Sequence, residues 1–141
     1  MAWQLRLAVI HAILYRKQWP ITVTEKERKW NKMWDLWAEG QAKAPYAQLM
    51  TYQSEINNGG HDQYFFNVSE VAELKTEVEA VLSILPEPLK GNLQRGYEAY
   101  RACPDAESEN DEIFGECDDV FYDNEQMINA LLEEYAATMK L

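Results

Sequence analysis

The chain has 141 residues, of which 47% are apolar and 12% aromatic. This composition excludes a disordered chain, and the length suits a single domain over residues 1–141 that folds without disulfides or metals. The net charge is −11, made up of +4 over residues 1–50 and −15 over residues 51–141. A protein this acidic is expected to be repelled by nucleic acid and by anionic membranes, and to attract basic proteins.

The first predicted elements are two helices. Residues 3–18 are rich in Leu, Ala and Ile and end before Pro20, and their apolar run is well short of the ~20 residues that span a bilayer. This favours a core helix over a signal peptide or membrane anchor. Thr24, with Glu27 three residues later, predicts a capping box that starts the second helix. Apolar residues in that helix recur on one face: Trp30, Met33, Trp34 and Trp37. We expect this stripe to be core, with a ligand platform or a self-association surface as alternatives.

A third helix is predicted to begin after Pro45 and to stop at the Asn-Asn-Gly-Gly segment 57–60, because Asn and Gly tolerate the left-handed backbone that ends a helix. The aromatic residues 63–67 then predict a short helix. Asn67 or Ser69 is expected to cap an amphipathic helix that ends at the prolines 86 and 88. Its predicted inward residues are Val71, Leu74, Val78, Val81, Leu82 and Leu85.

The last third of the chain combines acidic and helical patterns. A helix is predicted over residues 89–102, and the acidic stretch 104–119 has few apolar residues and predicts a loop or a solvated helix. A final helix is marked by apolar residues at helical spacing: Met127, Ile128, Leu131, Leu132, Tyr135 and Met139. Because no strand alternation appears, the predicted fold class is all-α, a single compact multi-helix bundle with an acidic C-terminal third.

The residue types that carry chemistry are few. Cys103 and Cys117 stand among carboxylates, which favours reduced thiols in a cytoplasmic protein over a single disulfide. The chain has no common catalytic, phosphate-binding or zinc motif, so we predict no enzyme activity, no catalytic residue, no metal and no cofactor. One dense polar cluster extends from Glu55 through His61 to Asn67. Its Asn and Asp side chains are expected to satisfy backbone groups between two helices. A small-ligand or enzymatic site centred on the same segment is the alternative.

The same segment carries a family resemblance. The sequence EINNGG over residues 55–60, followed by QYFFN over residues 63–67, resembles the signature of the DNA-mimic protein family, many members of which are domains of unknown function. Residues 117–122 and 132–135 are similar to two later elements of that family. The resemblance covers residues 46–141 and leaves residues 1–45 without a match. The motif residues are Glu55, Asn57, Asn58, Gly59, Gly60, Gln63, Phe65, Phe66 and Asn67. His61 stands where the family usually has Phe, and Cys117 where it usually has Leu.

The resemblance implies an all-helical fold and, for at least one member, a protein that imitates duplex DNA and occupies the DNA-binding face of a transcription regulator. The uncharged Asn and Gly residues of the motif cannot imitate phosphate, so we expect the motif to be structural. Surface carboxylates three or four residues apart on a helix lie ~5–6 Å apart, a spacing comparable with DNA phosphates. Ten acids and no base occur over residues 104–125: Asp105, Glu107, Glu109, Asp111, Glu112, Glu116, Asp118, Asp119, Asp123 and Glu125.

The predicted function is therefore an acidic protein-binding module, with a basic DNA-binding protein as the partner and with no direct binding to nucleic acid or membrane. The alternatives are the ligand or enzymatic site at the Asn-Asn-Gly-Gly segment, and a homodimer that forms through the tryptophan helix.

Overall fold

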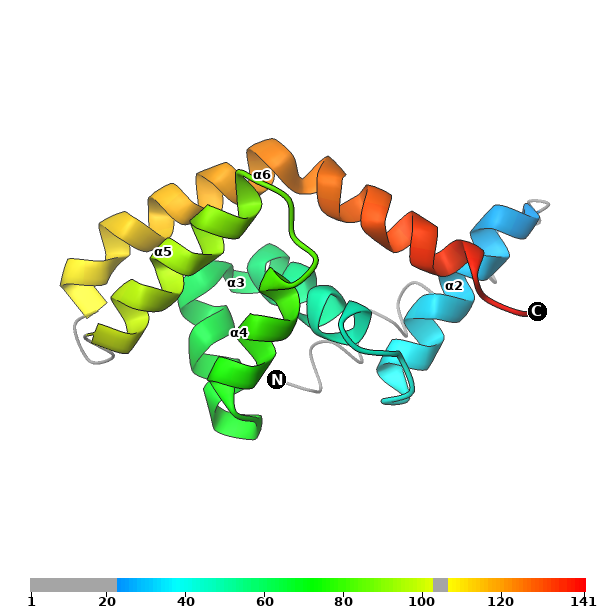
Figure 1. Cartoon of the computed structure of the whole chain (residues 1–141), viewed down its shortest axis with the longest axis horizontal. Coiled ribbons are helices and arrows are strands. Elements are labelled where there is room, and N and C mark those ends of the chain that lie inside the picture. Colours follow the sequence, from blue (N-terminus) through cyan, green and yellow to red (C-terminus); the bar gives the residue numbers. More distant parts are fainter. Residues whose placement is uncertain (1–22, 103–106) are drawn as a thin grey trace. The chain divides into compact units, whose positions relative to one another are not determined.

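The computed structural model describes residues 23–102 and 107–141, and the side chains of residues 107–109 lie outside that description. The helix expected over residues 3–18, Cys103 and Asp105 also lie outside it. The described residues form α-helices and no β-strand, which confirms the all-α fold class (Figure 1). The helices are α2 (Glu25–Ala38), α3 (Tyr46–Val71), α4 (Leu74–Leu82), α5 (Leu89–Ala102) and α6 (Glu107–Ala137). None of them is long and apolar enough to cross a membrane.

The chain divides into two compact units. Unit 1 contains Met1–Lys43 and Ala130–Leu141, and unit 2 contains Ala44–Asn129, so α6 begins in unit 2 and ends in unit 1. The charge is divided in the same way. Unit 2 contains four Lys or Arg residues and eighteen Asp or Glu residues, a net charge of −14, and the rest of the chain has a net charge of +3.

In unit 1, α2 begins as its sequence predicts. The Thr24 hydroxyl accepts a hydrogen bond from the Glu27 backbone N–H at 3.1 Å, and the Glu27 carboxylate accepts one from the Thr24 backbone N–H at 3.0 Å. These two bonds satisfy groups that the first turn of a helix leaves without an intrahelical partner.

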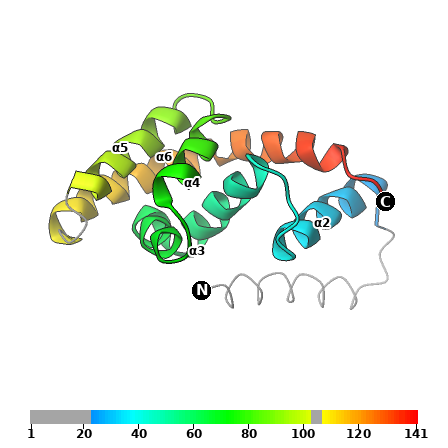
Figure 2. The same cartoon turned by 60° about the horizontal axis from the view of Figure 1, so that its bottom comes forward.

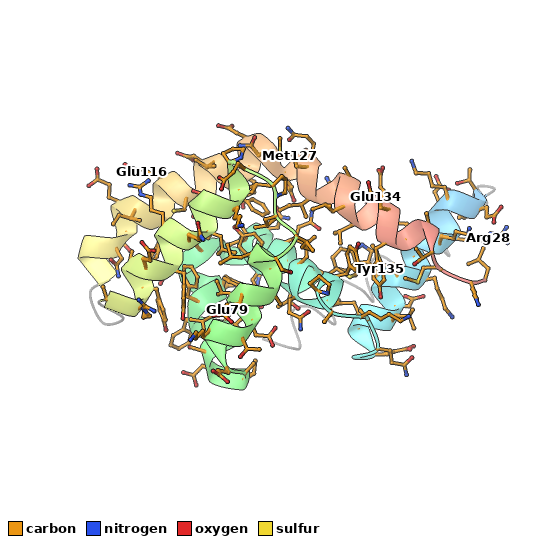
Figure 3. The ribbon with its side chains drawn as sticks, viewed as in Figure 1. Arg28, Glu79, Glu116, Met127, Glu134 and Tyr135 are labelled. Carbon is orange, nitrogen blue, oxygen red and sulfur yellow. The ribbon has the colours of Figure 1, made fainter. Side chains whose placement is uncertain are left out.

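The apolar face of α2 is partly buried within unit 1. Met33 has no exposed surface, and the tryptophans at positions 30, 34 and 37 are partly buried. The Trp34 ring meets Trp30 and Trp37 edge to face, with ring centroids 6.3 and 5.3 Å apart. Tyr135 near the end of α6, labelled in Figure 3, accepts a hydrogen bond from the Lys43 backbone N–H at 2.8 Å.

Unit 2 packs α3, α4, α5 and the first part of α6 around an aromatic core. Its largest buried side chains include Tyr52, Tyr64, Phe65 and Phe121. The bounds predicted for α5 are confirmed, and α5 lies beside the first part of α6 in two views of the molecule (Figures 1 and 2).

One predicted helix start in unit 2 is wrong. Neither Asn67 nor Ser69 caps a helix, because α3 continues through both to Val71 and α4 begins only at Leu74. The reason is that both side chains are used elsewhere: Asn67 donates to the Glu55 carboxylate at 2.7 Å, and the Ser69 hydroxyl donates to a carbonyl of its own helix at 2.7 Å. Val71, predicted to point inward, is 84% exposed.

The acidic stretch is helical from Glu107 onward, and it is continuous with the last predicted helix. The two form the 31-residue helix α6. The acidic part is held in place by a sparse set of buried side chains at helical spacing, namely Phe114, Cys117 and Phe121. The first part of α6 is therefore packed on one side through these three residues, and exposed acids lie at other positions around it.

Candidate functional site: a kinked motif and an acidic ridge

The motif segment forms a kink in α3. Gly60 has φ 81° and ψ −175°, and the residues on both sides of it are helical. Only glycine adopts this backbone region readily, so the helix is interrupted within the predicted Asn-Asn-Gly-Gly segment, but as a kink at Gly60 and not as a helix end, because α3 resumes and runs to Val71. A Cβ atom on Gly60 would also lie 2.5 Å from Oδ2 of Asp118 on α6. The kink therefore requires glycine for two separate reasons.

Glu55 joins the two arms of α3 across the kink. Its side chain is buried, and its Oε2 accepts hydrogen bonds from Gln63 Nε2 at 3.1 Å and from Asn67 Nδ2 at 2.7 Å. A Cβ atom on Gly59 would lie 2.1 Å from Gln63 Oε1, so Gly59 leaves room for that amide. These contacts give four of the motif residues a structural role that follows from their chemistry.

A second polar chain connects the kink to α6. Asp118 Oδ1 accepts a hydrogen bond from the His61 backbone N–H at 2.8 Å and contacts His61 Nδ1 at 2.6 Å. His61 Nδ1 donates to this carboxylate, and His61 Nε2 shares a hydrogen bond with the Tyr52 hydroxyl at 2.7 Å. Burial raises the pKa of Tyr52 well above its ordinary value of 10, which keeps this hydroxyl protonated.

Glu125 makes a similar connection about two turns further along α6. Its Oε2 accepts from Gln53 Nε2 at 3.1 Å and from Asn57 Nδ2 at 2.7 Å, and Gln53 also donates to Asn129 Oδ1 at 2.8 Å. Of the remaining motif residues, Phe65 is buried in the core, whereas Asn58 and Phe66 are exposed.

The motif cluster is thus a set of interlocked hydrogen bonds around a kink. Tyr52 and His61 have no exposed surface, and Glu55 is 4% exposed. Their side chains are hydrogen-bonded to one another, to neighbouring amides and to Asp118, which fixes the two arms of α3 to each other and to α6. Within residues 23–102 and 107–141, no group of three or more His, Cys, Asp or Glu side chains is arranged to hold a metal.

The other side of α6 carries the acids that face solvent. An α-helix turns about 100° per residue, so residues spaced by four, three and four positions share one face. This spacing relates the exposed residues Glu112, Glu116, Asp119 and Asp123, which we call the acidic ridge. Glu116 is labelled in Figure 3. Asp111 is also exposed, but it is seven residues before Asp118 and so is on that residue's side of α6, and the side chains of Glu107 and Glu109 lie outside the description.

The ten predicted acids therefore fall into separate groups. Asp118 and Glu125 are seven residues apart, so they share a side of α6, and that side faces α3. The helical period brings the four ridge acids together on a different side. Composition alone did not distinguish these groups, because a count of acids does not say on which side of the helix each one lies.

One base within unit 2 touches the ridge. Arg95 on α5 places its Nη2 atom 2.5 Å from Glu116 Oε2. The other three ridge acids form no ion pair with any residue in the described part of the chain. Sequence reasoning missed Arg95, because nothing in the local sequence of α5 indicates that this residue reaches α6.

The fold and the charge define an acidic, all-helical protein whose central helix is kinked at a Gly residue. The chain belongs to the DMP19-like protein family, whose model matches residues 22–139. This match starts earlier than the resemblance at residue 46 and includes α2. Comparisons with curated proteins and with solved structures each gave no match.

Proposed function

We propose that this protein is an acidic protein-binding module that imitates the charge of duplex DNA and occupies the DNA-binding face of a basic protein, such as a transcription regulator. The observation that carries this proposal is the acidic ridge on the exposed side of α6. Membership of the DMP19-like family supports it, because the motif resembles a family in which at least one member is a DNA mimic.

The dimensions of the ridge are suited to a groove that binds phosphates. Glu112 and Asp123 are eleven residues apart, which at ~1.5 Å per residue is about 16 Å of helix axis. One DNA strand presents about five phosphates over that length. Four carboxylates are therefore close to the charge density of a single strand, and bidentate Arg–carboxylate pairs have good geometry for such a contact.

The wider electrostatics of unit 2 favour the same kind of partner. Its net charge of −14 includes only four cationic residues. Of these, Lys75 lies 4.0 Å from Glu79 on α4, and Arg95 contacts the ridge. Such a field attracts basic proteins and repels nucleic acid, so the proposal includes no direct contact with DNA.

A capture experiment with charge-matched variants tests the proposal. The ridge-neutral variant carries Glu112→Gln, Glu116→Gln, Asp119→Asn and Asp123→Asn. The remote-neutral control removes the same charge from exposed acids elsewhere in unit 2: Glu70→Gln, Glu73→Gln, Glu79→Gln and Glu98→Gln. Each full-length protein is immobilised and exposed to a lysate of the source organism at about 50 mM and about 500 mM salt, a range over which screening of exposed charges becomes strong.

The expected result is a DNA-binding protein that is retained at low salt by the native chain and by the remote-neutral control, lost from the ridge-neutral variant, and displaced by duplex DNA. Retention by both variants, or failure of duplex DNA to displace the bound protein, would overturn the proposal. Self-association through the tryptophan face of α2 stays a prediction, which sedimentation at several protein concentrations tests.

A further inference from the structure

In the free protein, the Arg95 side chain forms an ion pair with the ridge acid Glu116. Its side chain and that of Glu116 are each about half exposed, at 53% and 49%. The hydrogen bond to Glu116 and the charge of that carboxylate raise the pKa of Arg95, and the charge of Glu112 adds to the effect. Arg95 is therefore close to two of the four ridge acids.

The contact between α5 and α6 is held by other residues. Asn92 is buried and donates to the Cys117 carbonyl at 2.8 Å. Gly96 is also buried, and a Cβ atom there would lie 3.3 Å from the Phe65 ring and 3.6 Å from Cys117 Sγ. Helices α5 and α6 thus pack closely at Gly96, the residue next to Arg95, and at Asn92. Exposed ion pairs contribute little to stability, so Arg95 is not needed to hold α5 against α6.

We propose that Arg95 is an internal competitor, which neutralises Glu116 until a cationic partner replaces it. This inference rests on the proposed function and adds a regulatory element to the same surface. A partner that addresses the ridge must either displace the Arg95 guanidinium from Glu116 or approach beside a like charge. Both effects weaken binding, and both disappear when Arg95 is removed.

The size of the effect follows from Coulomb's law in water. A unit charge ~5 Å from the incoming cation, at an exposed site and partly screened by salt, changes the dissociation constant by about threefold. Arg95→Gln is expected to tighten binding by about that factor, and Arg95→Glu, which adds a fifth acid to the ridge, by about tenfold. The gain should shrink as salt rises.

The test uses the full chain and a fluorescent peptide of about nine arginines, whose guanidinium groups pair with carboxylates as a partner's would. Fluorescence anisotropy gives the dissociation constant for native protein, Arg95→Gln, Arg95→Glu and the matched controls Lys90→Gln and Lys90→Glu. Lys90 is exposed on α5, five residues before Arg95, and therefore on a different side of the helix. Thermal unfolding of each variant establishes that it is folded.

Tighter binding for the Arg95 variants than for the Lys90 variants supports the inference. Equal shifts for both positions, or no gain from Arg95→Gln, overturn it. The ridge-neutral and remote-neutral variants are measured with the same peptide. If these two bind it equally, the proposed function fails, whatever the Arg95 variants do. If the ridge is required and Arg95 has no special effect, only the present inference fails.

Discussion

Gly60→Ala gives the sharpest test of how the motif holds the fold. The new methyl group meets two obstacles. The backbone at φ 81° and ψ −175° is strained for any residue with a Cβ atom, and that atom would lie 2.5 Å from Asp118 Oδ2. Asp118 must move away, and it then loses its hydrogen bonds to the backbone and the ring of His61.

The magnitude follows from these two effects. Backbone strain of this kind costs about 1–3 kcal/mol. The loss of Asp118 leaves buried N–H groups of His61 without an acceptor, at about 1–3 kcal/mol for such a group. The expected loss is therefore roughly 2–6 kcal/mol, a large part of the ~5–15 kcal/mol that stabilises a typical domain.

Urea unfolding followed by far-UV circular dichroism measures this loss, with Gly115→Ala as the matched control. Gly115 is exposed in the middle of α6, and a Cβ atom there would have nothing within 4 Å. That substitution should stabilise the protein by about 0.5–1 kcal/mol, because alanine favours the helix. A Gly60→Ala protein within about 1 kcal/mol of the native chain would refute this account of the kink.

Three further predictions concern buried groups of unit 2. Glu55→Ala leaves the buried amide of Asn67 and the partly buried amide of Gln63 without their acceptor and should lower the free energy of unfolding by about 2–4 kcal/mol. Glu55→Gln, which retains one oxygen, should cost less, and equal losses in urea unfolding would contradict this. Burial raises the pKa of both Tyr52 and Tyr64 above the ordinary value of 10. The unfolded chain then releases these protons first, so stability should be intact below about pH 10 and fall as pH rises beyond it; a flat unfolding midpoint from about pH 9 to about pH 11 would argue against this. Burial also raises the pKa of the Cys117 thiol. In a Cys103→Ser background, a disulfide reagent should therefore react at least about tenfold more slowly with folded than with urea-unfolded protein. Equal rates would show that the thiol is accessible.

Local chemistry in the sequence is enough to predict several elements. The capping box at Thr24 and the bounds of α5 depend on residues within a few positions, and both are confirmed. The break at Gly60 follows from the same kind of evidence. The failure at Asn67 has the opposite cause, because the partner of its side chain, Glu55, lies twelve residues away across the kink.

The candidate site was only partly predictable for a related reason. The sequence shows the acids as one cluster. Which of them lie on the ridge and which contact α3 depends on α6 being one continuous helix, because the helix fixes the side on which each residue lies. The stretch predicted either a loop or a solvated helix because its apolar residues are sparse. Had the spacing of Phe114, Cys117 and Phe121 been continued to Ile128, it would have indicated a single helix. The approach of Arg95 to Glu116 is a tertiary contact, and no local pattern predicts it.

The separation of the motif from the ridge has a consequence for divergence within the family. The residues that maintain the kink point into unit 2, whereas the ridge acids are on the outer side of α6. Substitutions can therefore change the charges on the outer side of α6 without disturbing the residues that keep unit 2 folded. Under the proposed function, two family members with the same Asn-Asn-Gly-Gly segment can therefore bind different partners.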